Sequence, residues 1–505
     1  MMTLPRIPAI SLFLSIFLSP VTAPCSGRDA DPEDLRAQLR EVLLDAGPAR
    51  AGIIEALRNL GPDKAKLAFP LVLQMPRRGF LKAFEQEVEF LPDHKAVTRE
   101  ILEDTVNLAL IARVGYPWGQ DLSRKDFETF VVSHRHGSER LTNWRRMFRE
   151  RVDLLEAAGR FAQEYRKAQG PAAKSEVFRR LIHHVNSVWL PSKAKYAPRG
   201  MPDLAPEDLL EKGTGRCTDL TCAFVCACRS FGIAATNVRA IWWPKGDGNH
   251  CWAAVLDPAS GEWVDVDAGL PGEPSDAYFR GFKDKRDFAK VYRIVPGQER
   301  GPVALAAEPR EGERSDPYID MYLLRVPMED VTAQYGPVAE ANLPGFPPGA
   351  LAYACVFNQG EWRPVAAARA DDKGWAVFSD LGANDVLYLA APCGALGRVA
   401  ARKELPPFVA RKDGKVKFFA GPADGEKAVA TDFKDPALKG WAEARLLRWD
   451  VERWASCGDV AIEGGSAGVE LLPGRLYILR NRMPSPGAAF TRPFALGPGN
   501  GIVRY

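Results

Sequence analysis

The sequence lacks any long hydrophobic run after its first two dozen residues, and it lacks blocks of basic residues. No later stretch reaches the ~20 consecutive apolar residues that a membrane-spanning helix needs. The formal net charge is only +3, spread thinly over 505 residues, without a basic and aromatic stripe that would hold a phosphate backbone. These absences argue against a transmembrane protein and against nucleic acid as a partner.

The sequence also lacks the evenly spread cysteines of a disulfide-stabilised exported domain. Of the nine cysteines, four are crowded into one short segment, at Cys217, Cys222, Cys226 and Cys228. Because structural bridges are normally distributed through loops, this crowding predicts mostly free, buried thiols.

No metal site or organic cofactor is predicted. Cys222 and Cys226 lie one helical turn apart, but no second Cys/His pair follows at the spacing of a structural zinc site. We therefore expect both to be small buried apolar residues. His134 and His136 have no nearby third ligand, which is typical of loop or surface residues. There is also no compact acidic loop of the kind that binds calcium.

The N-terminus has the pattern of a secretory signal. An apolar run at Ile10–Leu18 is too short to span a membrane and is followed by small residues up to Ala23. Two outcomes fit: cleavage after Ala23, or lipidation of Cys25, and Pro24 is unfavourable for both. We expect an exported protein, periplasmic or at the cell surface, that is either soluble or held by a lipid anchor at Cys25.

The chain is too long for one compact core and is predicted to be a multidomain α+β protein. Its first part has apolar residues at the 3.6-residue helical period. After about residue 300, short apolar segments alternate with turns, which is typical of β-sandwiches. The predicted units are a signal peptide (1–24), a helical region (25–170), a catalytic core (171–300), a β-sandwich-like domain (301–425) and a small β domain (426–505).

A cysteine, a histidine and an aspartate follow one another in the predicted core. Cys217 comes directly after Gly213-Thr-Gly-Arg and is predicted to open a helix that ends at Gly232. A helix N-terminus stabilises negative charge, so it favours the reactive thiolate. The N–H of Cys217 itself is then available for an oxyanion.

His250 and Asp267 lie on the two strands of a predicted hairpin. If the turn has four residues, Leu256 pairs with Gly261 and His250 lies directly opposite Asp267, with Cβ atoms ~4.5–5.5 Å apart. The carboxylate would then orient the imidazole toward the thiol. Asp265 lies one step along the same face and is the reserve candidate, since the register is uncertain.

With Gly215-Arg-Cys217 opening a helix, His250-Cys-Trp252 on a strand and Trp263-Val-Asp-Val-Asp267 beside it, the segment resembles the catalytic core of the transglutaminase-like superfamily, which has a papain-like fold. The resemblance covers about 100 of the 505 residues. It implies a nucleophile at Cys217, a base at His250 and an orienting acid at Asp267. One departure is Cys251, where the family usually has alanine.

The resemblance has two further implications. The family's second oxyanion donor falls on Trp189, although this residue could equally be an ordinary core tryptophan. Exported bacterial proteins with a helical region, this core and C-terminal β domains look similar over the whole length, including Asp330-Val-Thr, Cys355-Val-Phe-Asn and Trp362. That likeness bears on the architecture and not on a substrate.

The sequence leaves three functions open. The first is a cysteine-dependent acyl-transfer enzyme that hydrolyses amide or peptide bonds in a protein, a peptide or a cell-wall peptide, through a thioester. The second is a transglutaminase that passes the acyl group to an amine. The third is an inactive core on a surface protein that binds glycans or peptides through its β domains. In that case tryptophans would stack on sugars, the candidates being Trp362, Trp375, Trp441 and Trp454.

Overall fold

The computed structural model describes residues 32–75, 92–200, 202–269, 287–296, 301–324, 326–394, 399–402, 404–419, 427–450, 452–483 and 489–505. The predicted signal peptide and Cys25 lie outside these residues, so export and lipidation stay predictions. In the described part, no helix combines the length and the apolar character that crossing a membrane requires.

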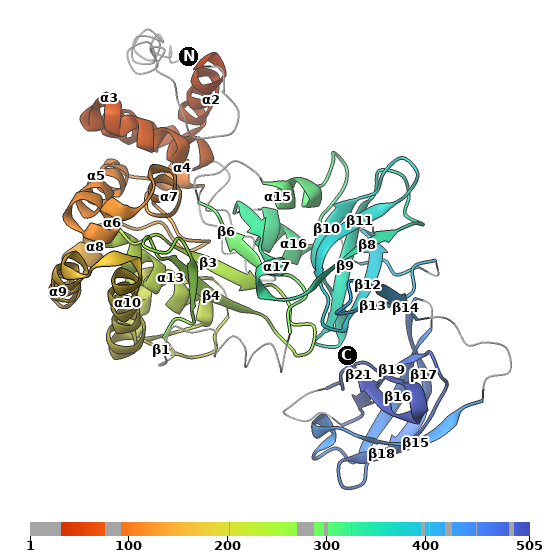
Figure 1. Ribbon diagram of the computed structural model, residues 1–505. Helices are drawn as coiled ribbons and strands as arrows, with labels where there is room; N and C mark the ends of the chain where they lie inside the picture. The colour runs from red at the N-terminus through yellow and green to blue at the C-terminus, as the bar shows by residue number, and fades with distance from the viewer. Residues whose placement is uncertain are drawn as a thin grey trace.

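The N-terminal part of the chain is built of helices that pack in two groups (Figure 1). One group has its own core, in which Leu57, Leu102 and Phe127 are buried. The other packs against the central unit through residues such as Phe148 and Phe178. The helices are α2 (Pro32–Asp45), α3 (Arg50–Gln74), α4 (Asp93–Ala96), α5 (Arg99–Gly115), α6 (Pro117–Asp121), α7 (Arg124–Phe130), α8 (Trp144–Arg149), α9 (Val152–Lys167) and α10 (Gly170–His183), with a 3₁₀ turn η1 (Gly47–Ala49).

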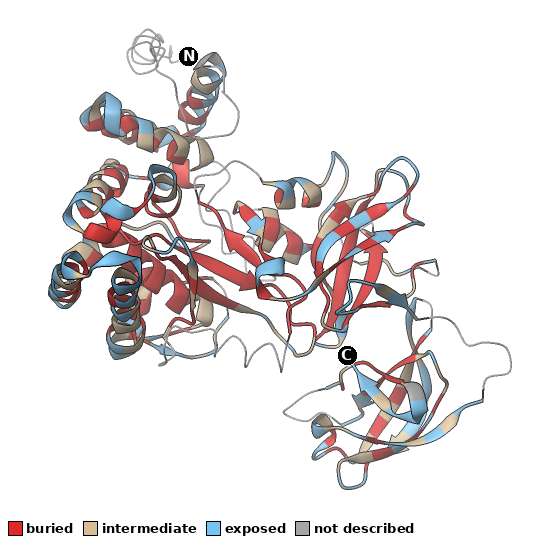
Figure 2. Ribbon diagram, in the orientation of Figure 1, coloured by how far each residue is buried: buried red, intermediate tan, exposed pale blue. Residues whose placement is uncertain are grey.

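The central unit packs one helix, α13 (Cys217–Ser230), against an antiparallel sheet of strand order β5-β4-β3-β6-β7. Every residue of α13 from Asp219 to Ser230 is buried. Figure 2 shows that buried residues concentrate in this helix and sheet. The strands are β3 (Ala235–Ala240), β4 (His250–Leu256), β5 (Trp263–Val266), β6 (Tyr292–Ile294) and β7 (Met328–Asp330).

Short elements lead from the helical region into α13. They are η3 (His184–Trp189), which has π-helical hydrogen bonding, α11 (Leu190–Lys193), β1 (Lys195–Tyr196), α12 (Pro206–Lys212) and β2 (Thr214–Gly215). Gly213 ends α12 in the left-handed conformation, with φ of 67°. β2 then pairs with β1 in parallel. The backbone before Cys217 is therefore anchored on both sides.

The β4–β5 register differs from the prediction by two residues. Leu256 pairs with Trp263 and not with Gly261. The turn is longer because the N–H of Asp257 donates to the carbonyl of Glu262 (2.9 Å), while Gly261 takes a left-handed φ of 75°. A shift of two residues leaves every side chain on its predicted face.

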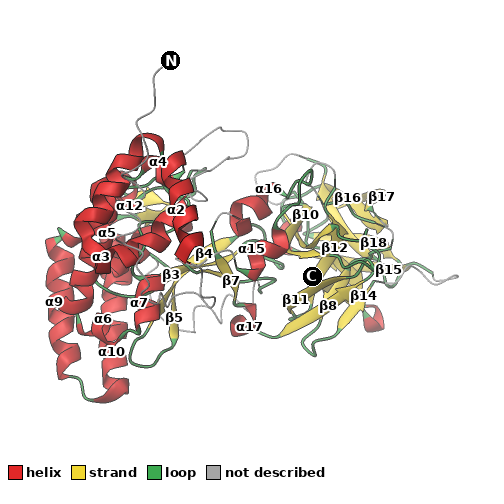
Figure 3. Cartoon of the chain, turned by 90° about the horizontal axis from the view of Figure 1, so that it is seen from above, coloured by secondary structure: helices red, strands yellow, loops and turns green. Residues whose placement is uncertain are grey.

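The C-terminal half forms antiparallel sheets, so the multidomain α+β class is confirmed. Figure 3 shows the N-terminal helices gathered at one end of the molecule and these strands at the other, with the short helices of residues 302–335 beside the strands. The first β unit has the sheets β10-β9-β12-β13-β14 and β11-β8, covered by short helices. Its elements are α15 (Pro302–Ala307), α16 (Pro317–Ile319), η4 (Asp320–Leu324), α17 (Thr332–Tyr335), β8 (Val338–Leu343), β9 (Leu351–Asn358), β10 (Glu361–Arg369), β11 (Ala376–Gly382), β12 (Val386–Pro392), β13 (Phe408–Ala410) and β14 (Val416–Phe418).

The last β unit has the sheets β15-β18 and β17-β16-β19-β20-β21 around its own core. Tryptophans join it to the first β unit: the ring of Trp362 lies edge-on to Trp449 at 5.6 Å, and Phe357 lies edge-on to Trp454 at 5.5 Å. The elements are β15 (Val429–Lys434), η5 (Pro436–Leu438), β16 (Glu443–Asp450), β17 (Arg453–Ala461), β18 (Ser466–Leu471), β19 (Leu476–Asn481), β20 (Phe494–Leu496), η6 (Pro498–Asn500) and β21 (Ile502–Arg504).

Candidate active site

Cys217 is the first residue of α13, where backbone N–H groups have no partner within the helix. The helix entry is fixed by Asp219, whose carboxylate accepts from the N–H of Arg216 and from the N–H of Leu204, each at 2.8 Å. Gly215 has no room for a side chain, because a Cβ there would lie 2.8 Å from the Cβ of Asp219. The sequence around Cys217 therefore holds the thiol at a defined helix N-terminus.

His250 begins β4, and its imidazole joins Cys217 to Asp267. Its Nε2 lies 2.9 Å from Oδ2 of Asp267, and the ring also hydrogen-bonds the Cys217 thiol. Because of the register shift, Asp267 follows the end of β5 diagonally from His250, on the same face of the hairpin. The rings of Trp243 and Trp252 flank the imidazole, with centroids 6.2 and 6.0 Å away. The three predicted residues thus lie together.

Hydrogen bonds within this group set its protonation. The pKa of Cys217 lies well below its ordinary value. The contact with the Cys251 thiol lowers it most; burial would raise it, and the contact with His250 lowers it further. Burial alone would lower the pKa of His250, but the hydrogen bonds with Asp267 and Cys217 outweigh it and raise the pKa to about 9. The pair therefore favours a thiolate and an imidazolium.

The reserve acid Asp265 has a different role from the one considered for it. Its Oδ1 accepts from Nε1 of Trp252 (2.9 Å) and from the hydroxyl of Tyr335 (2.7 Å). It lies opposite Ala254 in the β4–β5 ladder. Asp265 is therefore further than Asp267 from His250, the first residue of β4. Asp265 thus orients the ring of Trp252, which in turn packs beside His250.

Cys251 places a second thiol beside the first. It is buried, and its Sγ donates to Oγ1 of Thr218 at 3.4 Å. Burial and the neighbouring Cys217 raise its pKa well above the ordinary value, so it stays a thiol that can donate. Cys222 and Cys226 are buried in α13 as expected, and all eight cysteines of the described part are free.

Trp189 does not serve as the oxyanion donor. Its indole Nε1 donates to Oδ2 of Asp153 at 3.2 Å, and its ring packs edge-on against Phe148 at 5.8 Å. The side chain lies in the core between α8 and η3 and does not line the cavity at Cys217. Of the two roles considered for Trp189, the structure therefore agrees with the core tryptophan and not with the oxyanion donor, since its indole N–H is bonded to an acceptor on α9.

His134 and His136 were expected to be loop or surface residues, and they lie in a loop that is not on the surface. Both are buried: His134 Nε2 lies 2.7 Å from Asp93 Oδ2, and His136 Nε2 lies 3.3 Å from Nδ2 of Asn237. Their partners are about 40 and 100 residues away in sequence, which is why local spacing gave no sign of them. Among the residues that the structure describes, no group of three or more His, Cys, Asp or Glu is placed to hold a metal.

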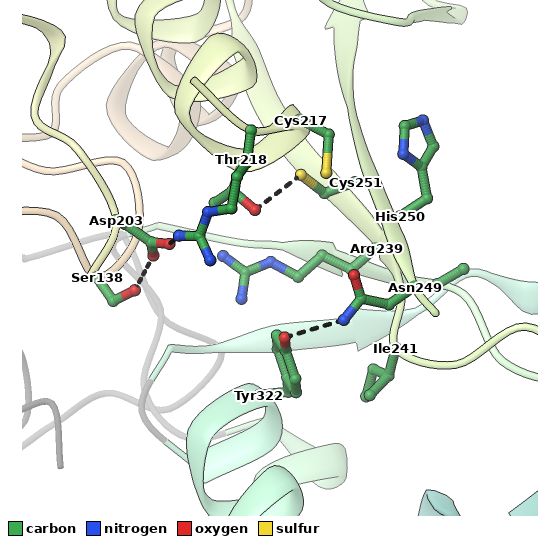
Figure 4. Close-up of a pocket in the computed structure, with 12 residues that line it drawn as sticks. Ser138, Asp203, Cys217, Thr218, Arg239, Ile241, Asn249, His250, Cys251 and Tyr322 are labelled. Atoms are coloured by element: carbon green, nitrogen blue, oxygen red, sulfur yellow. Dashed lines mark hydrogen bonds and ion pairs between the residues drawn. The ribbon is translucent and has the colours of Figure 1, made fainter. Parts of the chain in front are cut away.

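A cavity of about 90 Å³ opens beside the thiol (Figure 4). His250 and Cys251 line it together with charged and polar residues, most of which come from other parts of the chain. Those residues are Ser138, Asp203, Arg216, Thr218, Arg239, Asn249 and Tyr322. Tyr322 comes from η4, beyond the core, and its hydroxyl accepts from Nδ2 of Asn249 at 3.2 Å.

Sequence reasoning missed the residue that holds the loop in front of His250. Asn358, at the end of β9, is fully buried and donates to the carbonyls of Trp243, Gly246 and Gly248 at 2.9 to 3.0 Å. Its Oδ1 accepts from the N–H of Gly248 at 3.0 Å. The Cys355-Val-Phe-Asn stretch noted in the sequence was the available signal, but its contact with this loop depends on how the β unit docks.

Comparisons with known proteins bear on this core. A family model described as the transglutaminase-like superfamily matches residues 160–268, which include Cys217, His250 and Asp267. A comparison with curated proteins finds no significant match. Among solved structures, the chain is similar to the crystal structure of a transglutaminase from red sea bream, with 12% identity over 60% of this chain and a TM-score of 0.18. The chain spans 66% of that protein, just under two thirds, and at this TM-score the overlay carries no argument.

The family match agrees with the geometry already described. A cysteine at a helix N-terminus beside a histidine and a carboxylate supports cysteine-dependent acyl transfer as the general chemistry. Residues 160–268 of this chain form a core of the transglutaminase-like superfamily.

Proposed function

We propose that this protein is an exported cysteine-dependent enzyme that hydrolyses amide or peptide bonds. The observation that carries the proposal is the contact of His250 with both the Cys217 thiol and the Asp267 carboxylate. Cys217 is the nucleophile, His250 the acid and base, and Asp267 the acceptor that orients the imidazole.

In the first half of the reaction, Cys217 Sγ attacks the carbonyl carbon of the substrate. The C–N bond then breaks, and the imidazolium of His250 gives its proton to the departing amine, which leaves a thioester. The developing oxyanion is stabilised by the backbone N–H of Cys217 at the start of α13.

In the second half, water attacks the thioester carbonyl while His250 takes one proton from it. The C–S bond breaks, a carboxylic acid leaves, and the thiolate and imidazolium are restored. An amine in place of water would give transglutamination. We favour water because it is always present, whereas cross-linking needs a site that excludes it.

The test is alkylation of Cys217 by iodoacetamide as a function of pH, read by peptide mass spectrometry. Since the pKa of Cys217 is lowered, its thiolate persists below the ordinary cysteine pKa of ~8.5. Cys217 should therefore react fast in mildly acidic solution, where the exposed Cys457 in the same molecules reacts slowly. His250→Ala should abolish this advantage. Labelling no faster than that of Cys457 would refute the proposal.

Product analysis separates hydrolysis from cross-linking. With a glutamine peptide and an added primary amine, hydrolysis yields a glutamate peptide, and an amine adduct would contradict our preference. On substrates, we expect activity to fall above pH of about 9, because His250 then loses the proton that the leaving amine needs. Cys217→Ser should lack both products.

The predicted export has its own test. We propose that the mature protein lies in the periplasm or at the cell surface, from the apolar run Ile10–Leu18 and the small residues after it. Mass spectrometry of the mature N-terminus distinguishes a free end at Pro24 from a lipid-modified Cys25. An intact Met1 in the purified cellular protein would contradict export.

A further inference from the structure

The cavity beside Cys217 holds an arginine whose terminal nitrogens have no partner in the described part of the chain. Arg239 lies on β3, directly across from Cys251 on β4, and its side chain lines the cavity (Figure 4). The residue is only 6% exposed. Its Nε donates to Oδ1 of Asn237 at 3.0 Å, and among the described residues neither Nη1 nor Nη2 makes a hydrogen bond or an ion pair.

The acids near Arg239 are engaged elsewhere. Asp203 accepts from Nη2 of Arg216 at 2.5 Å and from the hydroxyl of Ser138. Glu139 accepts from the N–H groups of His136 and Gly137, each at 2.7 Å. No acid in the described residues lies within ion-pair distance of Arg239.

The charges of the cavity therefore sum to one excess positive charge. Arg216 and Asp203 cancel, and the thiolate of Cys217 cancels the imidazolium of His250. The guanidinium of Arg239 remains, held by Asn237 at Nε and lying 5.8 Å from the ring of Tyr322. A buried, unpaired guanidinium is costly, and the cost is recovered when an anion with matching geometry binds.

We propose that Arg239 binds a carboxylate of the acyl substrate and so determines specificity. This inference rests on the proposed function: the acyl group that Cys217 attacks carries a second, unreacting carboxylate close to the scissile carbonyl. A planar guanidinium can hold a carboxylate through two parallel hydrogen bonds. The cavity of about 90 Å³ has room for roughly six water molecules, which suits a short acidic side chain or chain end.

Two small reagents test this without a known substrate. Iodoacetate and iodoacetamide both alkylate a thiolate with loss of iodide, but only iodoacetate carries a carboxylate. In Arg239→Gln, the ratio of the iodoacetate rate to the iodoacetamide rate at Cys217 should fall at least about fivefold. Arg239→Lys should keep most of the ratio. Arg453→Gln, at an exposed arginine of the last β unit, should not change it.

The outcomes separate the two proposals. A ratio unchanged in Arg239→Gln, or two rates that fall by the same factor, would overturn the carboxylate site while leaving Cys217 as an activated nucleophile. The second result would mean that Arg239 acts only on the thiolate. Cys217 labelling no faster than Cys457 in the unmodified protein would refute the enzyme, and this inference with it.

A competition experiment on the unmodified protein covers the case in which Arg239→Gln does not fold. Glutarate should slow iodoacetamide labelling of Cys217 in a saturable manner. Glutaramide, the neutral diamide of the same length, should have no effect at the same concentration. Equal effects of the two, or no effect of glutarate, would contradict a carboxylate site.

Discussion

At the scale of single residues, the feature that sets this core apart is the pair of thiols at Cys217 and Cys251. In the sequence, Cys251 stands where the transglutaminase-like family usually has alanine. The structure gives it a larger role, because its pKa is raised and its side chain is the neighbour that lowers the pKa of Cys217 most. A polar neighbour of this kind stabilises a thiolate, as a histidine does.

Replacing the Cys251 thiol should weaken the nucleophile. In Cys251→Ala, the pKa of Cys217 should rise, because the thiolate loses the hydrogen bond that contributes most to lowering it. The iodoacetamide rate at Cys217 in mildly acidic solution should fall by roughly tenfold, and the pH profile should move to higher pH. Cys226→Ala, which removes a buried thiol away from the cavity, is the matched control. A profile that does not move would show that Cys251 only fills space.

At the scale of elements, local signals and distant contacts contributed differently. The helix that begins at Cys217 and ends before Gly232 could be predicted from its flanking glycines and from the helical spacing of its apolar residues. The grouping of Cys217, His250 and Asp267 could be predicted from their order in the chain and from the shared face of the hairpin. The hairpin register did not, since the turn after Leu256 gains two residues from one backbone hydrogen bond. Because a shift of two residues keeps each side chain on the same face of the hairpin, Asp267 was still correctly identified as the acid that contacts His250.

Contacts between distant segments were beyond sequence reasoning. Trp189 and His134 each have a partner on a separate element, Asp153 and Asp93, which no spacing rule reveals. Arg239 is one arginine among many in the sequence, and only the docking of β3 beside α13 brings it to the cavity. The general fold class and the reactive residues were therefore predictable, whereas the surroundings that tune them were not.

The loop from Trp243 to Asn249 gives a test at this scale. Asn358→Ala leaves the carbonyls of Trp243 and Gly246 and the N–H of Gly248 without the bonds from Asn358, while the Gly248 carbonyl keeps the N–H of Trp243. Each buried loss costs about 1–3 kcal/mol. We expect a lower free energy of unfolding and slower iodoacetamide labelling of Cys217, since the loop leads into His250. Asn342→Ala, at an exposed asparagine on β8, is the control. Labelling equal in the two variants would mean that the loop holds its shape without Asn358.

At the scale of the whole molecule, the two C-terminal β units are joined through aromatic packing. Trp449 contacts both Trp362 and Trp454 edge to face, and Trp441 lies in the core of the last unit. These rings are therefore used in packing and are not presented as a row for stacking on a sugar. Of the four tryptophans considered for glycan binding, Trp375 is the exposed one.

The junction should unfold first when its central ring is removed. Trp449 is 6% exposed and packs against both Trp362 and Trp454, so Trp449→Ala should cost roughly 3–5 kcal/mol. Differential scanning calorimetry should show the earliest transition moving to lower temperature, with new proteolytic cuts between the β units. Trp375→Ala, which truncates the same side chain at a site 40% exposed, should shift little. At 25 °C the labelling of Cys217 should stay unchanged in both, because neither ring lines the cavity. Equal shifts in the two variants would mean that the β units are held together by other contacts, such as that of the Arg492 guanidinium with the ring of Phe357, 5.7 Å away.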